Sequence, residues 1–256
     1  MQSTVSTLQE EIKSLQSGNT TLQKQLATVQ SNHALLLGPF VSVDPNPEIG
    51  VMGPNIIFSG ANIHIVSGSG ATNDNGNTTG LGNLIIGYDE DPAASPIINL
   101  PLQPGDRGGS HNLVIGGFNR FTRAAFGGLV AGENNRISNE GTVVLAGQIN
   151  TASGPFASVG GGEFNTASGD LSSVTGGLEN TASGNLCSVS GGQSNIANGF
   201  VGASVVGGEA NIASGILATV TGGFRNTANG YHTVVLGSQN VTDNKDLSIA
   251  PQPPFP

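Results

Sequence analysis

The 256-residue sequence has little of what enzymes and nucleic-acid-binding proteins usually carry. It contains no Trp, two Tyr, one Cys, and eight Lys plus Arg against seventeen Asp plus Glu. The resulting net charge of −9 argues against nucleic-acid binding, which requires a basic surface, and gives no attraction to an anionic membrane. No stretch reaches 18 consecutive apolar residues, so we expect no membrane span.

The single cysteine excludes an intrachain disulfide and leaves the redox compartment open. Cys187 occupies a position held elsewhere by Ala157, Ser172, Ala203 and Ala218, so we interpret it as a small buried residue rather than a nucleophile. The segment after Met1 is polar and lacks the basic and apolar regions of a secretory signal peptide. Either export uses another route, or the sequence is a processed or trimmed one.

What the sequence does have is glycine, 40 residues of it, and a short repeat over residues 110–243 whose copies read ASVGGGEFNTASG or SSVTGGLENTASG. An asparagine recurs at intervals of 14 to 16 residues, with a glycine always three residues earlier. These asparagines are Asn119, Asn135, Asn150, Asn165, Asn180, Asn195, Asn211, Asn226 and Asn240. Six residues before each stands Leu113, Leu129, Val144, Val159, Val174, Val189, Val205, Val220 or Val234. A fixed period this short predicts stacked units that contact only their neighbours.

Each unit is too short and too rich in glycine for a helical repeat. Residues alternate around the valine, with Ser172 and Val174 predicted to point inward and Ser173 and Thr175 outward, which is the period of a strand. An alanine two residues after most of the asparagines is also predicted to point inward. The sequence therefore predicts a narrow parallel β-solenoid whose nine coils, spaced ~4.8 Å apart, span roughly 43 Å. We interpret the asparagines as a structural ladder that satisfies turn backbone, not as binding residues.

The stretches HNLVIGG (111–117) and HTVVLGSQN (232–240) resemble the head repeat of trimeric autotransporter adhesins, the YadA-like or haemagglutinin-repeat family. The resemblance covers roughly residues 81–243 and has a coiled-coil stalk beside it, although the period here is mostly 15 residues rather than the usual 14. It implies a left-handed β-roll assembled as a homotrimer.

Residues 1–37 form the predicted coiled-coil stalk, because residues 2–37 carry five heptads without a skip. The core positions are Val5, Leu8, Ile12, Leu15, Asn19, Leu22, Leu26, Val29, His33 and Leu36. Asn19 in the core is typical of register control in dimers, so the heptads alone favour a dimer and the resemblance favours a trimer. His33 is either a titratable ring at the axis or a tolerated polar core residue.

The rest of the chain divides by composition. Residues 38–80 are predicted to be a neck, with two short strands within 55–66 and a flexible polar loop over 67–80. Residues 81–243 form the predicted solenoid, beginning with Leu84 and Gly87 at the repeat positions and interrupted by a proline-rich insertion at 91–110. Residues 244–256 are predicted to be an extended tail.

We searched the pattern for chemistry and predict no catalytic residues, no cofactor and no metal site. Glu133, Glu163 and Glu209 share one repeat position, but no second carboxylate recurs beside them, as a paired acid and base would require. His111 and His232 share another position, which suggests either a metal ring about a trimer axis or packing in the terminal coils. The solenoid also lacks the aspartate in every unit that calcium-binding repeats carry.

The sequence therefore predicts a non-enzymatic surface fibre, extracellular or at a cell or particle surface, whose trimeric head binds a cell-surface, matrix or glycan partner. One alternative is a filament subunit or an appendage resembling a phage tail fibre, since the stalk precedes the head and no anchor follows it. A third is ice binding, because Ser173/Thr175, Ser188/Ser190 and Thr219/Thr221 form an outward face of hydroxyls, interrupted by Gly160, Val206 and Val235.

Overall fold

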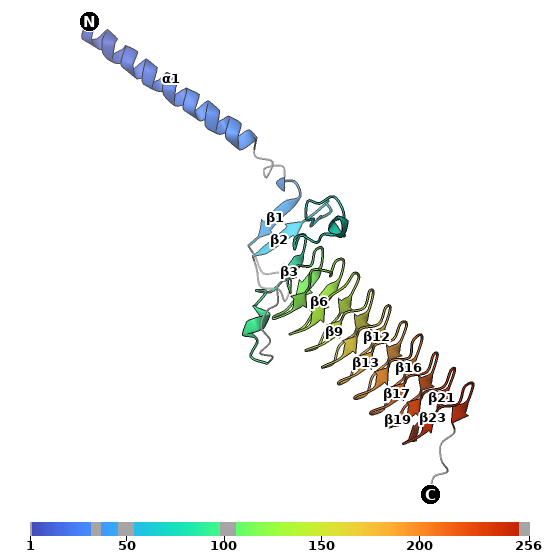
Figure 1. Cartoon of the computed structure of the whole chain (residues 1–256). Helices are drawn as coiled ribbons and strands as arrows, with labels where there is room; N and C mark the ends of the chain where they lie inside the picture. The colour runs from blue at the N-terminus through green and yellow to red at the C-terminus, as the bar shows by residue number, and fades with distance from the viewer. Residues whose placement is uncertain (1, 32–36, 46–53, 98–105, 251–256) are drawn as a thin grey trace. The chain divides into compact units, whose positions relative to one another are not determined.

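The computed structural model describes residues 2–31, 37–45, 54–97 and 106–250, and the chain divides into two units, Met1–His64 and Ile65–Pro256 (Figure 1). The first unit contains helix α1 (Gln2–Gln30) and the antiparallel strands β1 (Val41–Asp44) and β2 (Asn55–Phe58). The second unit is a parallel β-solenoid, as the repeat predicted.

Helix α1 exposes its predicted heptad core in the single chain. The seven apolar core side chains within it are 51% to 73% exposed: Val5, Leu8, Ile12, Leu15, Leu22, Leu26 and Val29. Asn19 is exposed as well, whereas His33 and Leu36 lie outside the described residues. A helix with one apolar stripe is stable when that stripe is buried against a partner.

Of the two strands predicted within residues 55–66, the first is confirmed and the second is wrong. Strand β2 occupies only residues 55–58, and residues 61–66 form no strand. Its partner is β1, with Val41 opposite Phe58, instead of the residues that follow Gly60. The local alternation of apolar residues carried no information about a partner earlier in the sequence.

The solenoid consists of two parallel sheets that face each other. The eleven-stranded sheet contains β3 (Leu84–Ile86), β4 (Leu113–Ile115), β6 (Leu129–Ala131), β8 (Val143–Val144), β10 (Ser158–Val159), β12 (Ser173–Val174), β14 (Ser188–Val189), β16 (Ser204–Val205), β18 (Thr219–Val220), β21 (Val234–Val235) and β24 (Ile249–Ala250). The nine-stranded sheet contains β5 (Arg120–Phe121), β7 (Arg136–Ile137), β9 (Thr151–Ala152), β11 (Thr166–Ala167), β13 (Thr181–Ala182), β15 (Ile196–Ala197), β17 (Ile212–Ala213), β20 (Thr227–Ala228) and β23 (Thr242–Asp243). A further pair, β19 (Gly223–Phe224) and β22 (Ser238–Gln239), lies at a turn, and two 3₁₀ turns, η2 (Asp74–Gly76) and η3 (Pro92–Ala94), precede the regular coils.

The core of the solenoid consists of one column from each sheet and a column of small residues two positions before the valine, among them Ala157, Cys187, Ala203 and Ala218. The eleven-stranded sheet contributes a valine from each coil, from Val114 to Val235, and each is at most 1% exposed. The nine-stranded sheet contributes Phe121 and Ile137 in the first coils and then an alanine in every coil from Ala152 to Ala228. The large residues therefore fill the first coils, and the rest of the rod is thin.

The recurrent glycine is required by the close stacking of coils at the turn. Gly162 has φ +80°, which favours glycine, and a Cβ atom placed on it would lie 2.1 Å from the carbonyl oxygen of Gly177 in the next coil. Any side chain there would force the coils apart.

Three of the nine predicted interior residues are displaced by one position. Leu113, Leu129 and Val234 are only half-buried, and the fully buried residues are Val114, Val130 and Val235. In the coils of Val114 and Val130, the buried valine lies one residue closer in sequence to the ladder asparagine than it does in the later coils. Because both candidate positions are apolar in each of these coils, the pattern alone could not distinguish them.

The assignment of Asn240 to the ladder was also wrong. Asn240 is exposed with φ +57°, and the ladder position of that coil is Val241, whose backbone N–H donates to Asn226 Oδ1 at 3.0 Å. The repeat then continues past Asp243, because β24 pairs with β21 through Val235 and Ala250. The predicted tail therefore begins later than residue 244, and residues 251–256 lie outside the described part.

Candidate functional site

The side-chain donors and acceptors of the asparagine ladder are satisfied by hydrogen bonds within the chain. Asn180 is typical: its Nδ2 donates to the carbonyl oxygens of Gly176 and Gly192 at 3.0 and 2.9 Å, and its Oδ1 accepts from Asn195 N at 3.0 Å. The eight ladder residues, from Asn119 to Asn226, are at most 1% exposed. No atom of these side chains remains to contact a ligand, so the ladder is a structural element.

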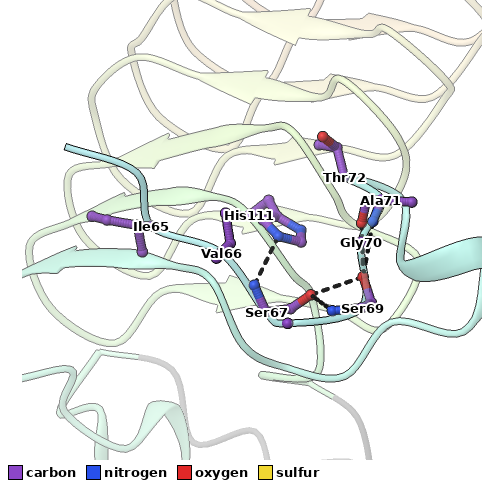
Figure 2. A pocket seen from close by; sticks show the side chains of 9 residues that line it. Ile65, Val66, Ser67, Ser69, Gly70, Ala71, Thr72 and His111 are labelled. Carbon is purple, nitrogen blue, oxygen red and sulfur yellow. Dashed lines mark hydrogen bonds between the residues drawn. The ribbon is translucent and has the colours of Figure 1, made fainter. Parts of the chain in front are cut away.

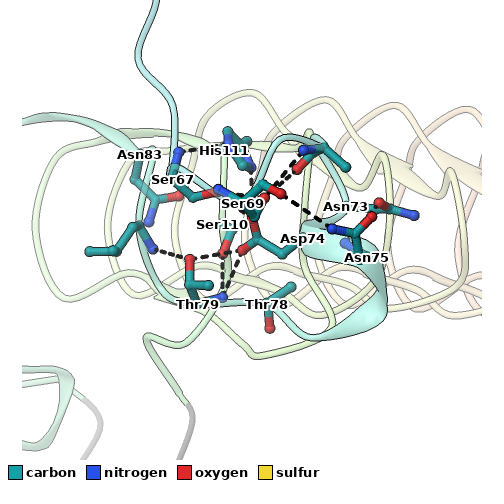
Figure 3. A network of polar contacts seen from close by, with 12 residues as sticks. Ser67, Ser69, Asn73, Asp74, Asn75, Thr78, Thr79, Asn83, Ser110 and His111 are labelled. Carbon is teal, nitrogen blue, oxygen red and sulfur yellow. Dashed lines mark hydrogen bonds and ion pairs between the residues drawn. The ribbon is translucent and has the colours of Figure 1, made fainter.

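A cluster of polar side chains lies at the first coil, around Asp74 (Figure 3). The predicted flexible loop 67–80 is instead held by this carboxylate, whose side chain is fully buried. Ser69 Oγ donates to Oδ1 at 2.7 Å, and the backbone N–H and hydroxyl of Thr79 donate to Oδ2 at 2.7 and 2.8 Å. Hydrogen bonds from Ser110, Ser67 and Ser69 hold the pKa of Asp74 well below its usual range.

Beside this cluster, an open depression of about 550 Å³ is lined by residues 65–72 and His111 (Figure 2). His111 Nε2 accepts a hydrogen bond from the backbone N–H of Ser67 at 3.1 Å. The proton of the neutral ring is therefore on Nδ1, which is buried, makes no hydrogen bond and lies 3.9 Å from Asp74 Oδ1. The hydrogen bond that His111 accepts from Ser67 holds loop 67–80 against the first coil.

Serine, histidine and aspartate meet here, but their order differs from that of a nucleophilic triad. A triad requires the serine hydroxyl to donate to the histidine and the histidine to donate to the carboxylate. Here Ser67 Oγ donates to Asp74 directly, and the histidine nitrogen facing Ser67 is occupied by a backbone N–H. We conclude that this cluster closes the first coil, a role that loop composition did not reveal.

The remaining predicted residues lie apart from one another. His232 is exposed and packs edge-on against Tyr231, with ring centroids 4.2 Å apart, so it does not share the environment of His111. Cys187 is buried, and burial raises the pKa of its thiol. Within the described residues, no group of three or more His, Cys, Asp or Glu side chains could hold a metal ion.

The carboxylates at the shared repeat position do not lie in consecutive coils. Glu133, Gln148 and Glu163 bridge in sequence along one turn, and Gln148 Nε2 donates to Glu133 Oε2 at 3.2 Å. Glu133 and Glu163 are thus two coils apart in this column, and Glu209 lies three coils beyond Glu163.

The outer face of the eleven-stranded sheet carries the predicted hydroxyls in two columns. Ser173, Ser188 and Thr219 are half-buried and aligned by strand pairing, and Ser188 Oγ donates to Ser204 Oγ at 3.1 Å. Thr175, Ser190 and Thr221 are exposed. Val235 is buried and therefore does not interrupt this face. The exposed apolar residues that do interrupt it are Leu145, Val206 and Leu236.

A more regular face on the nine-stranded sheet was missed. Strand pairing aligns Thr151, Thr166, Thr181, Ile196, Ile212, Thr227 and Thr242 in one outward column in which every residue is β-branched. Beside it runs a column of serine and asparagine, within which Asn229 Nδ2 donates to Asn244 Oδ1 at 2.8 Å. The Thr-Ala-Ser triplets at 151–153, 166–168 and 181–183 could have revealed it.

Among the described residues, no helix has the length and apolar character needed to cross a membrane. The chain matches no protein-family model, and a comparison with curated proteins finds no significant match, so the likeness to trimeric adhesin heads rests on the repeat motifs themselves.

Proposed function

We propose that this protein is a non-enzymatic, homotrimeric surface fibre of adhesin type, whose solenoid binds a cell-surface, matrix or glycan partner outside the cell. The observation that carries the proposal is the contrast in burial between its two kinds of apolar repeat. The solenoid valines are at most 1% exposed, whereas the heptad residues of α1 are 51% to 73% exposed. A second and third copy of α1 would cover that stripe.

The heptads support self-association, and the repeat motifs favour three chains over two. A core asparagine such as Asn19 is typical of register control in dimeric coiled coils, so the heptads alone favour two copies. The number of copies is therefore the first quantity to measure. A parallel bundle of α1 helices would gather identical solenoids at one end of the assembly. Many weak and equivalent contacts would then combine into firm attachment.

The charge distribution restricts the partner. Residues 137–224 contain no Lys or Arg but include Glu140, Glu163, Asp170, Glu179 and Glu209. This part of the solenoid would repel polyanions such as sulfated glycans and nucleic acids. The partner is therefore an uncharged glycan or a neutral or basic protein surface.

Ice binding is a second candidate function, supported by the β-branched column of the nine-stranded sheet. Coils spaced ~4.8 Å apart repeat hydroxyls and methyls on a flat face, the kind of array that can order water. Freezing-point depression by the purified protein, absent from a variant with Thr166 and Thr181 replaced by Lys, would favour this alternative over adhesion.

Electron microscopy of the purified full chain tests the proposal. We expect discrete particles with a thin stalk and a rod-like head, which attach to a glycan or matrix array. End-to-end polymers would instead favour a filament subunit or tail-fibre-like part. Compact particles that hydrolyse a glycan would overturn the proposal.

A further inference from the structure

One corner of the solenoid carries large apolar side chains where the backbone favours glycine. Phe156, Leu171, Leu186 and Leu217 stand three residues before the buried valine of their coils, each with φ between +54° and +57°. Gly141 and Gly202 occupy the same position in other coils, with φ +58° and +66°. The turn therefore forms with glycine, and the large residues add backbone strain that the coil does not require.

These side chains stack along the corner but remain half-exposed. A Cβ atom on Gly141 would lie 2.6 Å from the ring of Phe156, and one on Gly202 would lie 2.7 Å from Leu217 Cδ2. Phe156 and Leu217 thus lean over the same position of the preceding coil. Even so, Phe156, Leu171 and Leu186 are 55% to 56% exposed and Leu217 is 41% exposed.

Two neighbours extend this apolar corner, which we define as Phe156, Leu171, Leu186, Phe200, Ile216 and Leu217. Phe200 is an extra residue in its coil and is 75% exposed, and Ile216 is 40% exposed. Between residues 150 and 217, six of the eight exposed large apolar side chains lie at this corner; Phe164 and Val206 lie elsewhere. The corner exposes on the order of 600 Å² of apolar surface, close to the ~800 Å² per partner of a stable interface.

We propose that the apolar corner is the surface along which the solenoid packs against a second copy of this chain, an inference that rests on the homo-oligomeric fibre proposed above. Parallel copies present the same side chains at the same coil spacing, so a contact made at one coil recurs at the next. The heptads of α1 favour copies that run in the same direction and in register. A polyanionic partner is disfavoured because residues 137–224 contain no basic side chain.

Hydroxyl-radical footprinting of the full-length protein, with particle mass measured on the same sample, tests this inference. Leu145 and Phe164 serve as internal controls, because they are 58% and 45% exposed in the single chain and lie outside the corner. We expect Leu171 and Leu186 to be labelled severalfold less than Leu145, and Phe156 severalfold less than Phe164.

Two outcomes separate this inference from the proposed function. A particle of several chains whose corner is labelled as strongly as the controls would overturn the inference and leave the fibre intact. A particle of one chain would overturn both.

A pair of matched variants provides the second test. Leu171→Glu with Leu186→Glu places charge on the corner, whereas Leu145→Glu with Val206→Glu places it on side chains of similar exposure elsewhere. All four positions are exposed in the single chain, so both variants should fold. We expect only the corner variant to melt at a lower temperature, because like charges from neighbouring copies would meet; equal melting of the two variants would overturn the inference.

Discussion

The solenoid and helix α1 use apolar residues in opposite ways. In the solenoid, each coil buries its valine and alanine against the coils above and below, and each ladder asparagine satisfies the backbone of its neighbours. In α1 the apolar stripe has no partner within the described chain, and its side chains are more than half exposed. One repeat buries its apolar residues within a single chain, and the other leaves them exposed.

This difference indicates where each kind of substitution should act. A change in the solenoid interior should unfold coils whatever the number of chains, since the contacts lie within one molecule. A change in the stripe of α1 should act only through assembly. The following substitutions separate the two cases.

The largest effect is expected for Val189→Asp in the middle of the valine column. Val189 is 1% exposed, so the substitution buries an unpaired carboxylate and should cost on the order of 4 kcal/mol. Ser190→Asp, at the exposed next residue, is the control and should change stability by less than about 0.5 kcal/mol. Thermal unfolding followed by circular dichroism measures both, and equal melting temperatures would show that the column is not an interior.

The next effect is expected for Leu22→Ala in α1, and it should appear in assembly. If the stripe is a coiled-coil core, losing this leucine should cost roughly 3 kcal/mol per chain in the assembled state. Lys24→Ala, on the opposite side of the heptad, should leave the assembly unchanged. Analytical ultracentrifugation over a dilution series compares them, and identical dissociation of both variants would show that the stripe does not mediate association.

A smaller effect is expected for Asn180→Ala in the ladder. The substitution removes the donor to Gly176 O and Gly192 O and the acceptor for Asn195 N, which should cost about 2 kcal/mol. Asn198→Ala is the matched control, because Asn198 is exposed and outside the ladder, and it should be nearly neutral. Chemical denaturation of the two variants decides; a ladder variant as stable as the control would contradict the structural role.

The smallest effect is expected at low pH, in the loop held by Asp74. The hydrogen bonds to its carboxylate lower its pKa in the folded state, so the stability it contributes is present above the ordinary aspartate pKa of about 3.9. That contribution is lost as the pH falls below this value toward the folded-state pKa. Hydrogen exchange in residues 67–80 should therefore accelerate in acid, and Asp74→Asn should remove the dependence. Equal protection of the loop at pH 7 and pH 3 would argue against it.

The period of the repeat was sufficient to predict the coil architecture because strand alternation and turn glycines recur in every unit. It failed where two adjacent residues suited the same position, as with Leu113 and Val114 or Val234 and Val235, since burial depends on one residue of turn length. The order of loop 67–80 could not be predicted, because it depends on Asp74 accepting bonds from residues as distant as Ser110. The pairing of β1 with β2 was missed for the same reason: the partner lies elsewhere in the sequence.

The mass of the intact assembly of the full-length protein tests the central claim most directly. One chain has a mass of 25.7 kDa, so the account predicts three copies, about 77 kDa, in native mass spectrometry or light scattering. A dimer would keep the contrast between the buried solenoid valines and the stripe of α1 that needs a partner, but it would contradict the trimer that the resemblance to adhesin heads implies. A particle of 25.7 kDa at micromolar concentration would contradict the account, because the stripe of α1 would then have no partner.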